Sequence, residues 1–151
     1  MDPERMGADE TDALIEAFAA LEPYPEVEPA LRRLQDNGIP MVTLSVGNAA
    51  NVARLFERSG LAELVDTHLS CEEVRRWKPA PEPYLHACRV LGFDASEVCM
   101  VAVHSWDIGG AAAAGLQTAW VSRLEGIFDA NFGEPDVIGA DLVAVVERLL
   151  S

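Results

Sequence analysis

Apolar residues recur along this chain with two kinds of spacing, one typical of helices and one typical of strands. Apolar residues three and four apart predict helices over 11–21, 28–36, 49–59, 81–91, 108–114 and 141–150. Short apolar or β-branched runs predict strands over 40–45, 65–69, 98–103 and 118–121, with a further run at 136–138. Strands that alternate with helices indicate βαβ units. We therefore predict an α/β fold, a Rossmann-like parallel sheet of about four strands with helices on both faces.

Details of the pattern add expectations about burial and helix ends. Leu31 and Leu34 share one helix face, which predicts that both are buried. The run 98–103 contains only apolar or small residues, as expected of a strand buried on both faces. Asn37-Gly38 is a plausible left-handed helix end.

Composition narrows the class of protein. The chain has 151 residues, of which 50% are hydrophobic, enough for one domain with a real core. Its net charge of −14 argues against a nucleic-acid partner and against an anionic membrane surface. No apolar run reaches a membrane-spanning length, and the polar start is unlike a signal peptide. We expect a cytoplasmic protein. Three scattered cysteines without a CxxC spacing predict neither a disulfide framework nor a zinc site.

Candidate chemistry lies where strands are predicted to end. Ser45 closes one strand and is followed by Gly47 and Asn48, while Asp107 follows another strand. Lys78 stands before a proline on the loop between them. In an open α/β sheet, ligands bind at the carboxyl ends of the strands. These residues are therefore candidates for a common site.

Each candidate also has a purely structural interpretation. Asn48 and Asp107 are acceptable helix N-caps, which would make Ser45 an ordinary strand-end hydroxyl. A lysine before a helix that starts with prolines is compatible with a surface position. His104 and Trp106 are compatible with loop packing. Taken singly, none of these residues establishes a function.

The order of these candidate residues along the chain is more informative than any one of them alone. The segments LSVGN (44–48), WKPAP (77–81) and AVHSWDIGGA (102–111) resemble the second, third and fourth motifs of the haloacid dehalogenase superfamily, in particular its L-2-haloacid dehalogenases. The resemblance extends over residues 12–150. It implies an N-terminally incomplete core at 23–151, preceded by a remnant of the cap or its return helix at 1–22.

The resemblance implies a role for each motif residue. Ser45 would hold a substrate oxygen, Lys78 would stabilise a nucleophilic carboxylate, and Asp107 would position or activate water. In the family an aspartate displaces halide, and water then hydrolyses the aspartyl ester, without a cofactor. Substrate contacts would come from four further residues of the motifs: Gly47, Asn48, His104 and Trp106. The substrate implied is a small halogenated carboxylic acid.

Three departures from the family pattern keep alternatives open. Val46 stands where the dehalogenases place an asparagine, and Ala102 and His104 replace polar residues. No apolar strand with an Asp precedes residue 39, so the nucleophile is expected to be absent and the isolated chain inactive.

An inactive remnant of the fold is therefore one alternative. A phosphatase of the superfamily, which would need Mg²⁺ and further carboxylates, is another. A receiver-type binding domain ranks third, because the required acidic pair is lacking.

The absent first strand has a structural consequence. In the family it lies between the strands that end at Ser45 and at His104. We expect those two strands either to pair directly or to leave a gap of roughly 9–10 Å, about two strand spacings. Unpaired inner edges favour a homo-oligomer or a partner that adds a strand.

Overall fold

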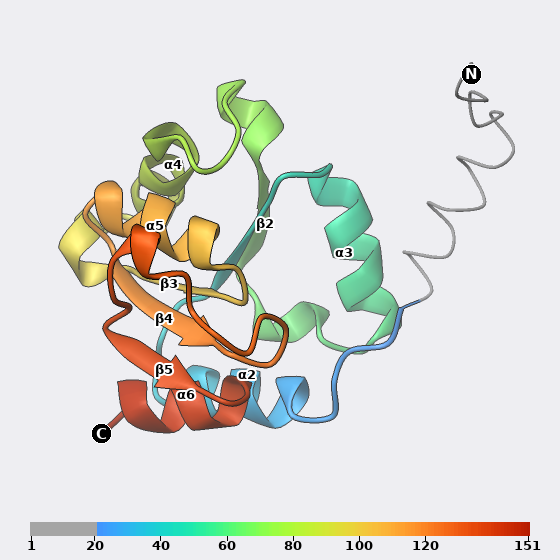
Figure 1. Cartoon of the computed structure of the whole chain (residues 1–151). Coiled ribbons are helices and arrows are strands. Elements are labelled where there is room, and N and C mark those ends of the chain that lie inside the picture. Colours follow the sequence, from blue (N-terminus) through green and yellow to red (C-terminus); the bar gives the residue numbers. More distant parts are fainter. Residues whose placement is uncertain (1–20) are drawn as a thin grey trace, which may run out of the picture.

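The computed structural model describes residues 21–151, which form five parallel strands in two sheets (Figure 1). The smaller sheet pairs β1 (Val42–Ser45) with β2 (Thr67–Ser70), with Val42 opposite Thr67. The larger has the order β3 (Cys99–Ala102), β4 (Gln117–Val121), β5 (Val137–Gly139). In it Cys99 lies opposite Gln117, and Ala119 lies opposite Val137. All pairings are parallel, as the alternation of elements predicted.

Helices cover both faces of these sheets. Helix α6 (Leu142–Leu149) contacts β4, β5 and α2 (Val27–Asp36) on one face. On the other face α5 (Ser105–Ala113) contacts β3 and β4, and α4 (Pro81–Leu91) contacts β1 and α5. Helix α3 (Ala49–Arg58) packs against β2 (Figure 1). Residues 21–151 also contain four short 3-10 helices: η1 (Ala62–Leu64), η2 (Cys71–Val74), η3 (Ala95–Glu97) and η4 (Ala130–Phe132).

Local signals account for several helix ends. The Asn48 side chain accepts a hydrogen bond from the Ala50 amide at 2.8 Å and so caps α3. Asp141 caps α6 in the same way. Gly38 and Gly92 adopt φ values of +70° and +78° just after α2 and α4, a conformation that glycine reaches without strain. The left-handed helix end predicted at Asn37-Gly38 is thereby confirmed.

Three details of the sequence prediction were wrong. Helix α5 begins at Ser105, three residues earlier than predicted, so Asp107 lies in its first turn and is not its N-cap. The β3 residues are all only half-buried, because one edge of this strand has no partner strand within residues 21–151. Leu31 and Leu34 are also only half-buried, and Ala30 is the buried residue of α2. The predicted helix 11–21 falls almost wholly outside the described residues.

The two sheets share one apolar layer without joining into one sheet. Leu44 of β1 and Met100 of β3 pack against the same buried cluster, which includes Tyr84 and Ala111. Nevertheless, within residues 21–151 no backbone ladder connects β1 to β3. The predicted interruption of the sheet is therefore present among these residues, and direct pairing of the two strands is not found. The expected absence of a central strand in residues 1–20 lies outside the described part of the chain.

A cavity of about 270 Å³ lies at the carboxyl end of β3. Three consecutive β3-region residues line it, together with residues from the start of α2 and from the segment after β4. Val121 at the end of β4 and Leu142 at the start of α6 also line it, so the cavity lies where β3 and β4 end. At its rim the Arg123 guanidinium lies 4.1 Å from the Tyr24 ring centroid and forms an ion pair with Glu26.

No helix within residues 21–151 is long and apolar enough to cross a membrane.

Candidate active site

A buried ion pair joins two of the predicted catalytic residues. The Lys78 ammonium lies 2.9 Å from Asp107 Oδ2, and the two side chains are only 4% and 10% exposed. Lys78 comes from the loop before α4, and Asp107 from the first turn of α5, where the positive end of the helix dipole favours a carboxylate. The structure thus brings together two groups that are 29 residues apart in sequence. The surface interpretation of Lys78 is wrong.

Tyr84 of α4 holds the other oxygen of this carboxylate. Its hydroxyl donates to Asp107 Oδ1 at 2.7 Å, and the side chain is fully buried. Burial, followed by the adjacent Asp107 carboxylate, raises the pKa of Tyr84 well above its usual range. Tyr84 therefore remains a proton donor, and Asp107 has a cation on one oxygen and a hydroxyl on the other. Such a carboxylate is fixed in orientation.

Close packing of α5 against the Lys78 loop depends on Gly110. A Cβ at this position would lie 2.7 Å from both Pro79 Cβ and Tyr84 Oη. Real Cβ atoms do not approach so closely, so only glycine allows this separation between α5 and the loop. Gly110 lies one turn after Asp107 in α5. Its small size therefore permits the close approach of α5 to the loop that carries Lys78.

Ser45, Gly47 and Asn48 belong to a second cluster, at the carboxyl ends of β1 and β2. Ser45 Oγ accepts a hydrogen bond from the Gly47 amide at 3.0 Å, and Gly47 O accepts one from Ser70 Oγ at 2.9 Å. The Asn48 amide donates to Glu72 of η2 at 3.4 Å. The Gly47 N–H is thus engaged within the turn. Within residues 21–151 no hydrogen bond or ion pair links this cluster to Lys78 or Asp107.

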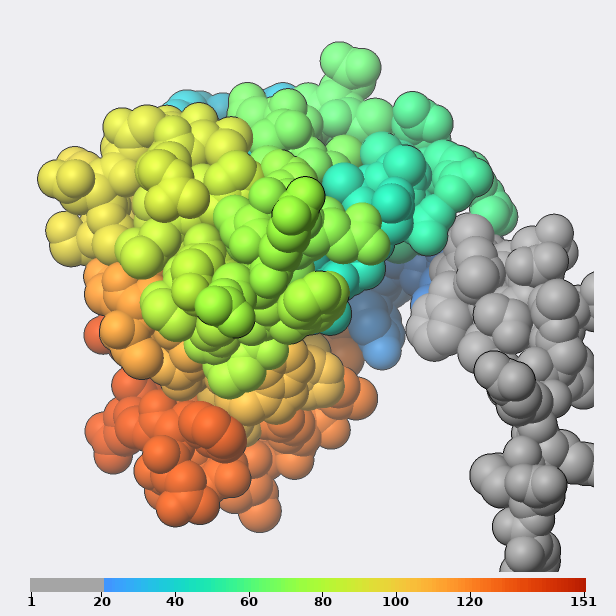
Figure 2. All heavy atoms as spheres, turned by 90° about the horizontal axis from the view of Figure 1, so that it is seen from above, coloured from blue at the N-terminus to red at the C-terminus, as the bar shows by residue number. Residues whose placement is uncertain are grey.

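The segment that carries Lys78 connects the two clusters in space. Figure 2 shows the region around residues 71–80, in bright green, against the yellow α4 region and the teal α3 region. Helix η2 contacts α4, and its Glu72 reaches the start of α3. On η2 the pKa of Glu73 is lowered, first by its hydrogen bond with His86 and then by the Ser70 amide. These contacts hold the η2 end of the segment, and the Lys78–Asp107 pair holds its other end.

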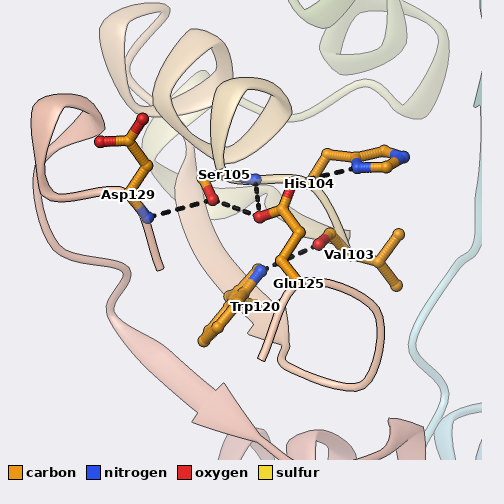
Figure 3. A network of polar contacts seen from close by, with 6 residues as sticks. All are labelled: Val103, His104, Ser105, Trp120, Glu125 and Asp129. Atoms are coloured by element: carbon orange, nitrogen blue, oxygen red, sulfur yellow. Dashed lines mark hydrogen bonds and ion pairs between the residues drawn. The ribbon is translucent and has the colours of Figure 1, made fainter. Parts of the chain in front are cut away.

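A third cluster surrounds the start of α5 (Figure 3). Glu125, on the loop after β4, contacts both His104 and Ser105. The His104 ring stacks on Trp106 with a centroid distance of 5.7 Å and an interplanar angle of 18°. His104 is the N-cap of α5, and its carbonyl accepts a hydrogen bond from the Asp107 amide at 3.1 Å. This cluster is therefore linked through the backbone to the Lys78–Asp107 pair.

The sequence analysis did not assign a role to three residues of this region: Tyr84, Glu125 and Gly110. Tyr84 resembles an ordinary apolar-face residue of α4, and Glu125 lies in a loop with no motif of its own. The Gly109-Gly110 pair within a helical pattern was the only available signal for the close approach at α5. As for metal chemistry, residues 21–151 contain no group of three or more His, Cys, Asp or Glu side chains placed to hold an ion.

Comparison with known proteins supplies the family. A model of the haloacid dehalogenase-like hydrolases matches residues 3–115. The chain belongs to this family. Its relationship to L-2-haloacid dehalogenases, at about 30% identity over most of the chain, confirms the resemblance read from the three motifs.

Individual relatives agree in both sequence and structure. The chain is 34% identical to (S)-2-haloacid dehalogenase 4A of Burkholderia cepacia over 112 residues, covering 74% of this chain and 48% of that protein. It is 33% identical to (S)-2-haloacid dehalogenase of Pseudomonas sp. (strain YL) over 134 residues, covering 89% and 58%. The crystal structure of the L-2-haloacid dehalogenase RSc1362 matches with a TM-score of 0.90 and 31% identity, covering 97% and 65%. The chain spans about half the length of the curated relatives that it matches.

Proposed function

We propose that this chain carries part of the active site of a hydrolase that cleaves the carbon–halogen bond of small 2-haloacids through an aspartyl-ester intermediate. The observation that carries the proposal is the buried Lys78–Asp107 pair, in a chain of the haloacid dehalogenase-like family. A fixed lysine beside a carboxylate suits an ester mechanism, because it stabilises negative charge without a metal ion. The names of the relatives in both comparisons agree with this substrate class.

We assign each role from the resemblance of the three motifs to those of the family. Lys78 stabilises the nucleophilic carboxylate and the charge that develops on the ester. Asp107, held by Lys78 and Tyr84, positions the water that hydrolyses the ester. Ser45 binds a substrate oxygen after exchanging its contact with the Gly47 amide. Gly47, Asn48, His104 and Trp106 form the remaining substrate contacts. The reaction uses no cofactor.

The nucleophile has to reach Lys78 from a strand that no residue within 21–151 supplies. We propose that this strand enters between β1 and β3, whose facing edges have no partner strand among the described residues. We propose that a complementing partner segment provides this strand and that the chain by itself is inactive. Residues 1–22 act as a remnant of the cap or its return helix, and 23–151 as the incomplete hydrolase core.

An inactive remnant of the fold is the second candidate. The separation of β1 from β3 among the described residues favours it, since it divides the sheet at the point where the site is built. Under this alternative the Lys78–Asp107 pair only stabilises the fold. The phosphatase alternative has no comparable structural support within residues 21–151, but its metal requirement is easily tested.

The experiment supplies the strand as a peptide. The 151-residue chain is incubated with 2-chloropropionate, with or without a synthetic peptide in which a Val- and Ile-rich run precedes one aspartate. A matched control peptide carries asparagine in place of that aspartate. Halide is measured by ion chromatography, and product acid by liquid chromatography, with and without EDTA. A generic phosphate ester serves as the competing substrate.

We expect halide release with the aspartate peptide only, unaffected by EDTA, while both peptides raise the melting temperature. Asp107→Asn should leave halide release intact and let the peptide ester accumulate, visible as a mass shift. Lys78→Ala should remove most activity, on the order of a hundredfold or more. Halide release without peptide would show that the nucleophile lies within the 151 residues. Phosphate-ester hydrolysis that EDTA abolishes would replace the dehalogenase proposal with a phosphatase. A peptide that binds without any turnover would favour the inactive remnant.

A further inference from the structure

Glu125 gathers three contacts from the start of α5 (Figure 3). Its Oε2 accepts hydrogen bonds from both the amide and the hydroxyl of Ser105, the amide at 2.9 Å. Its Oε1 lies 3.2 Å from His104 Nδ1. The Ser105 hydroxyl in turn accepts a hydrogen bond from the Asp129 amide at 3.2 Å. The carboxylate is thus held on one side by α5 and its own loop, and presents its other oxygen to the imidazole.

This carboxylate is charged near neutral pH. Hydrogen bonds from the Ser105 hydroxyl, and next from the Ser105 amide, lower the pKa of Glu125 below its usual range. Its position at the amino end of α5 adds the favourable helix dipole. Since an ionised carboxylate can only accept hydrogen bonds, a neutral His104 must keep its proton on Nδ1. His104 Nε2 then carries the free lone pair.

The orientation of the ring places that lone pair outside the cluster. In Figure 3 the second ring nitrogen of His104 points away from the other five labelled residues. The side chain is 42% exposed, and no residue within 21–151 forms a hydrogen bond with Nε2. Stacking on Trp106 restricts rotation of the ring. The backbone of His104 contacts Asp107 directly, so the free nitrogen lies at the same end of α5 as the buried ion pair.

We propose that His104 is a second proton-transfer group of the site and that Glu125 is its positioning residue. The inference rests on the proposed function. In the hydrolytic step a water O–H bond breaks, and its proton moves to His104 Nε2. The hydroxide oxygen forms a bond to the ester carbonyl carbon. The acyl C–O bond then breaks, and the leaving 2-hydroxyacid oxygen takes the proton back from His104. The nucleophile is left as a carboxylic acid, which releases its proton to bulk water, so that the carboxylate is regenerated.

The orientation of His104 can be tested without turnover. Nitrogen-15 NMR of the imidazoles distinguishes the Nδ1–H from the Nε2–H tautomer, with His68 and His86 as internal references. We expect the Nδ1–H tautomer for His104, and its loss in Glu125→Ala. Ser105→Ala is the matched control, because it removes a Glu125 contact while leaving the imidazole contact in place. An Nε2–H tautomer, or a tautomer unaffected by Glu125→Ala, would overturn the inference.

The catalytic role is tested by separating the two chemical steps in the peptide-complemented chain. His104→Ala should slow ester hydrolysis on the order of 10²–10⁴-fold and should slow halide release at saturating 2-chloropropionate far less. Added imidazole should restore part of the lost rate. A merely structural residue would slow both steps together and show no rescue by imidazole, which would refute the proposal. If no halide is released at all, the proposed function fails together with the ester step, while the NMR result still decides whether Glu125 orients His104.

Discussion

Breaking the buried Lys78–Asp107 ion pair should destabilise the fold far more than breaking an exposed ion pair with a similar N–O distance. Lys78→Met removes the cation, retains most of the apolar stem, and leaves the Asp107 carboxylate buried with only the Tyr84 hydroxyl as partner. Removal of one partner from a buried pair costs about 3–5 kcal/mol. For a domain of this size that corresponds to a fall in melting temperature of roughly 6–20 °C.

Two further variants test the cause. Arg32→Met removes the cation of an exposed pair with Glu28, whose separation of 2.8 Å is similar to the 2.9 Å of the buried pair, and should cost less than about 1 kcal/mol. Combining Lys78→Met with Asp107→Asn eliminates the stranded charge while leaving an acceptor for Tyr84. This double variant should recover about half or more of the loss.

Urea denaturation followed by circular dichroism gives the free energy of unfolding for each variant. If Lys78→Met is too unstable to fold, Tyr84→Phe serves instead. It removes the hydroxyl that is shared between Asp107 Oδ1 and the Asp107 carbonyl, and it should cost about 1.5–3 kcal/mol. Equal costs for Lys78→Met and Arg32→Met would refute the reasoning. So would a double variant no more stable than Lys78→Met alone, since the stranded charge would then not be the cause.

Three further predictions concern other contacts. Gly110→Ala should cost about 1–3 kcal/mol of unfolding free energy through overpacking, whereas Gly47→Ala, whose Cβ meets only ordinary contact at 3.6 Å, should change it much less; equal effects in urea denaturation would contradict the close approach at α5. Burial, and next Asp136, raises the pKa of Cys99 to about 11, so its alkylation rate measured by mass spectrometry should still be rising between pH 9 and 10 instead of levelling off. Because the folded pKa of Glu125 is depressed, its stabilising contribution is present above its ordinary value of 4.5 and is lost as the pH falls through the folded value. The stability difference between wild type and Glu125→Gln should therefore shrink at acid pH, and a difference that stays constant down to pH 3 would argue against this contact.

Local sequence determined the elements and their order. Within residues 21–151, apolar periodicity gave four strands and a further run that is the fifth, and it gave the five α-helices, usually within one to three residues of their observed ends. It did not predict the four 3-10 helices. Asn48, Gly38 and Gly92 marked helix ends, because capping and left-handed turns depend on one residue and its immediate neighbours. The motifs around Lys78 and Asp107 also pointed to one site, since parallel strands bring their carboxyl ends to the same edge.

Only the tertiary structure decided the contacts between segments distant in sequence. The burial of Lys78, the hydroxyl of Tyr84 on Asp107, and the contact of Glu125 with His104 each depend on how α4, α5 and the loop after β4 pack. None of these has a local signature, because hydrogen bonds across 21 to 29 residues depend on the whole arrangement of the layers. The burial of a strand was likewise a property of its neighbours. The run 98–103 is apolar enough for a fully covered strand, yet β3 is only half-buried, because one of its edges has no partner strand within residues 21–151. An apolar sequence does not specify whether such a partner is present.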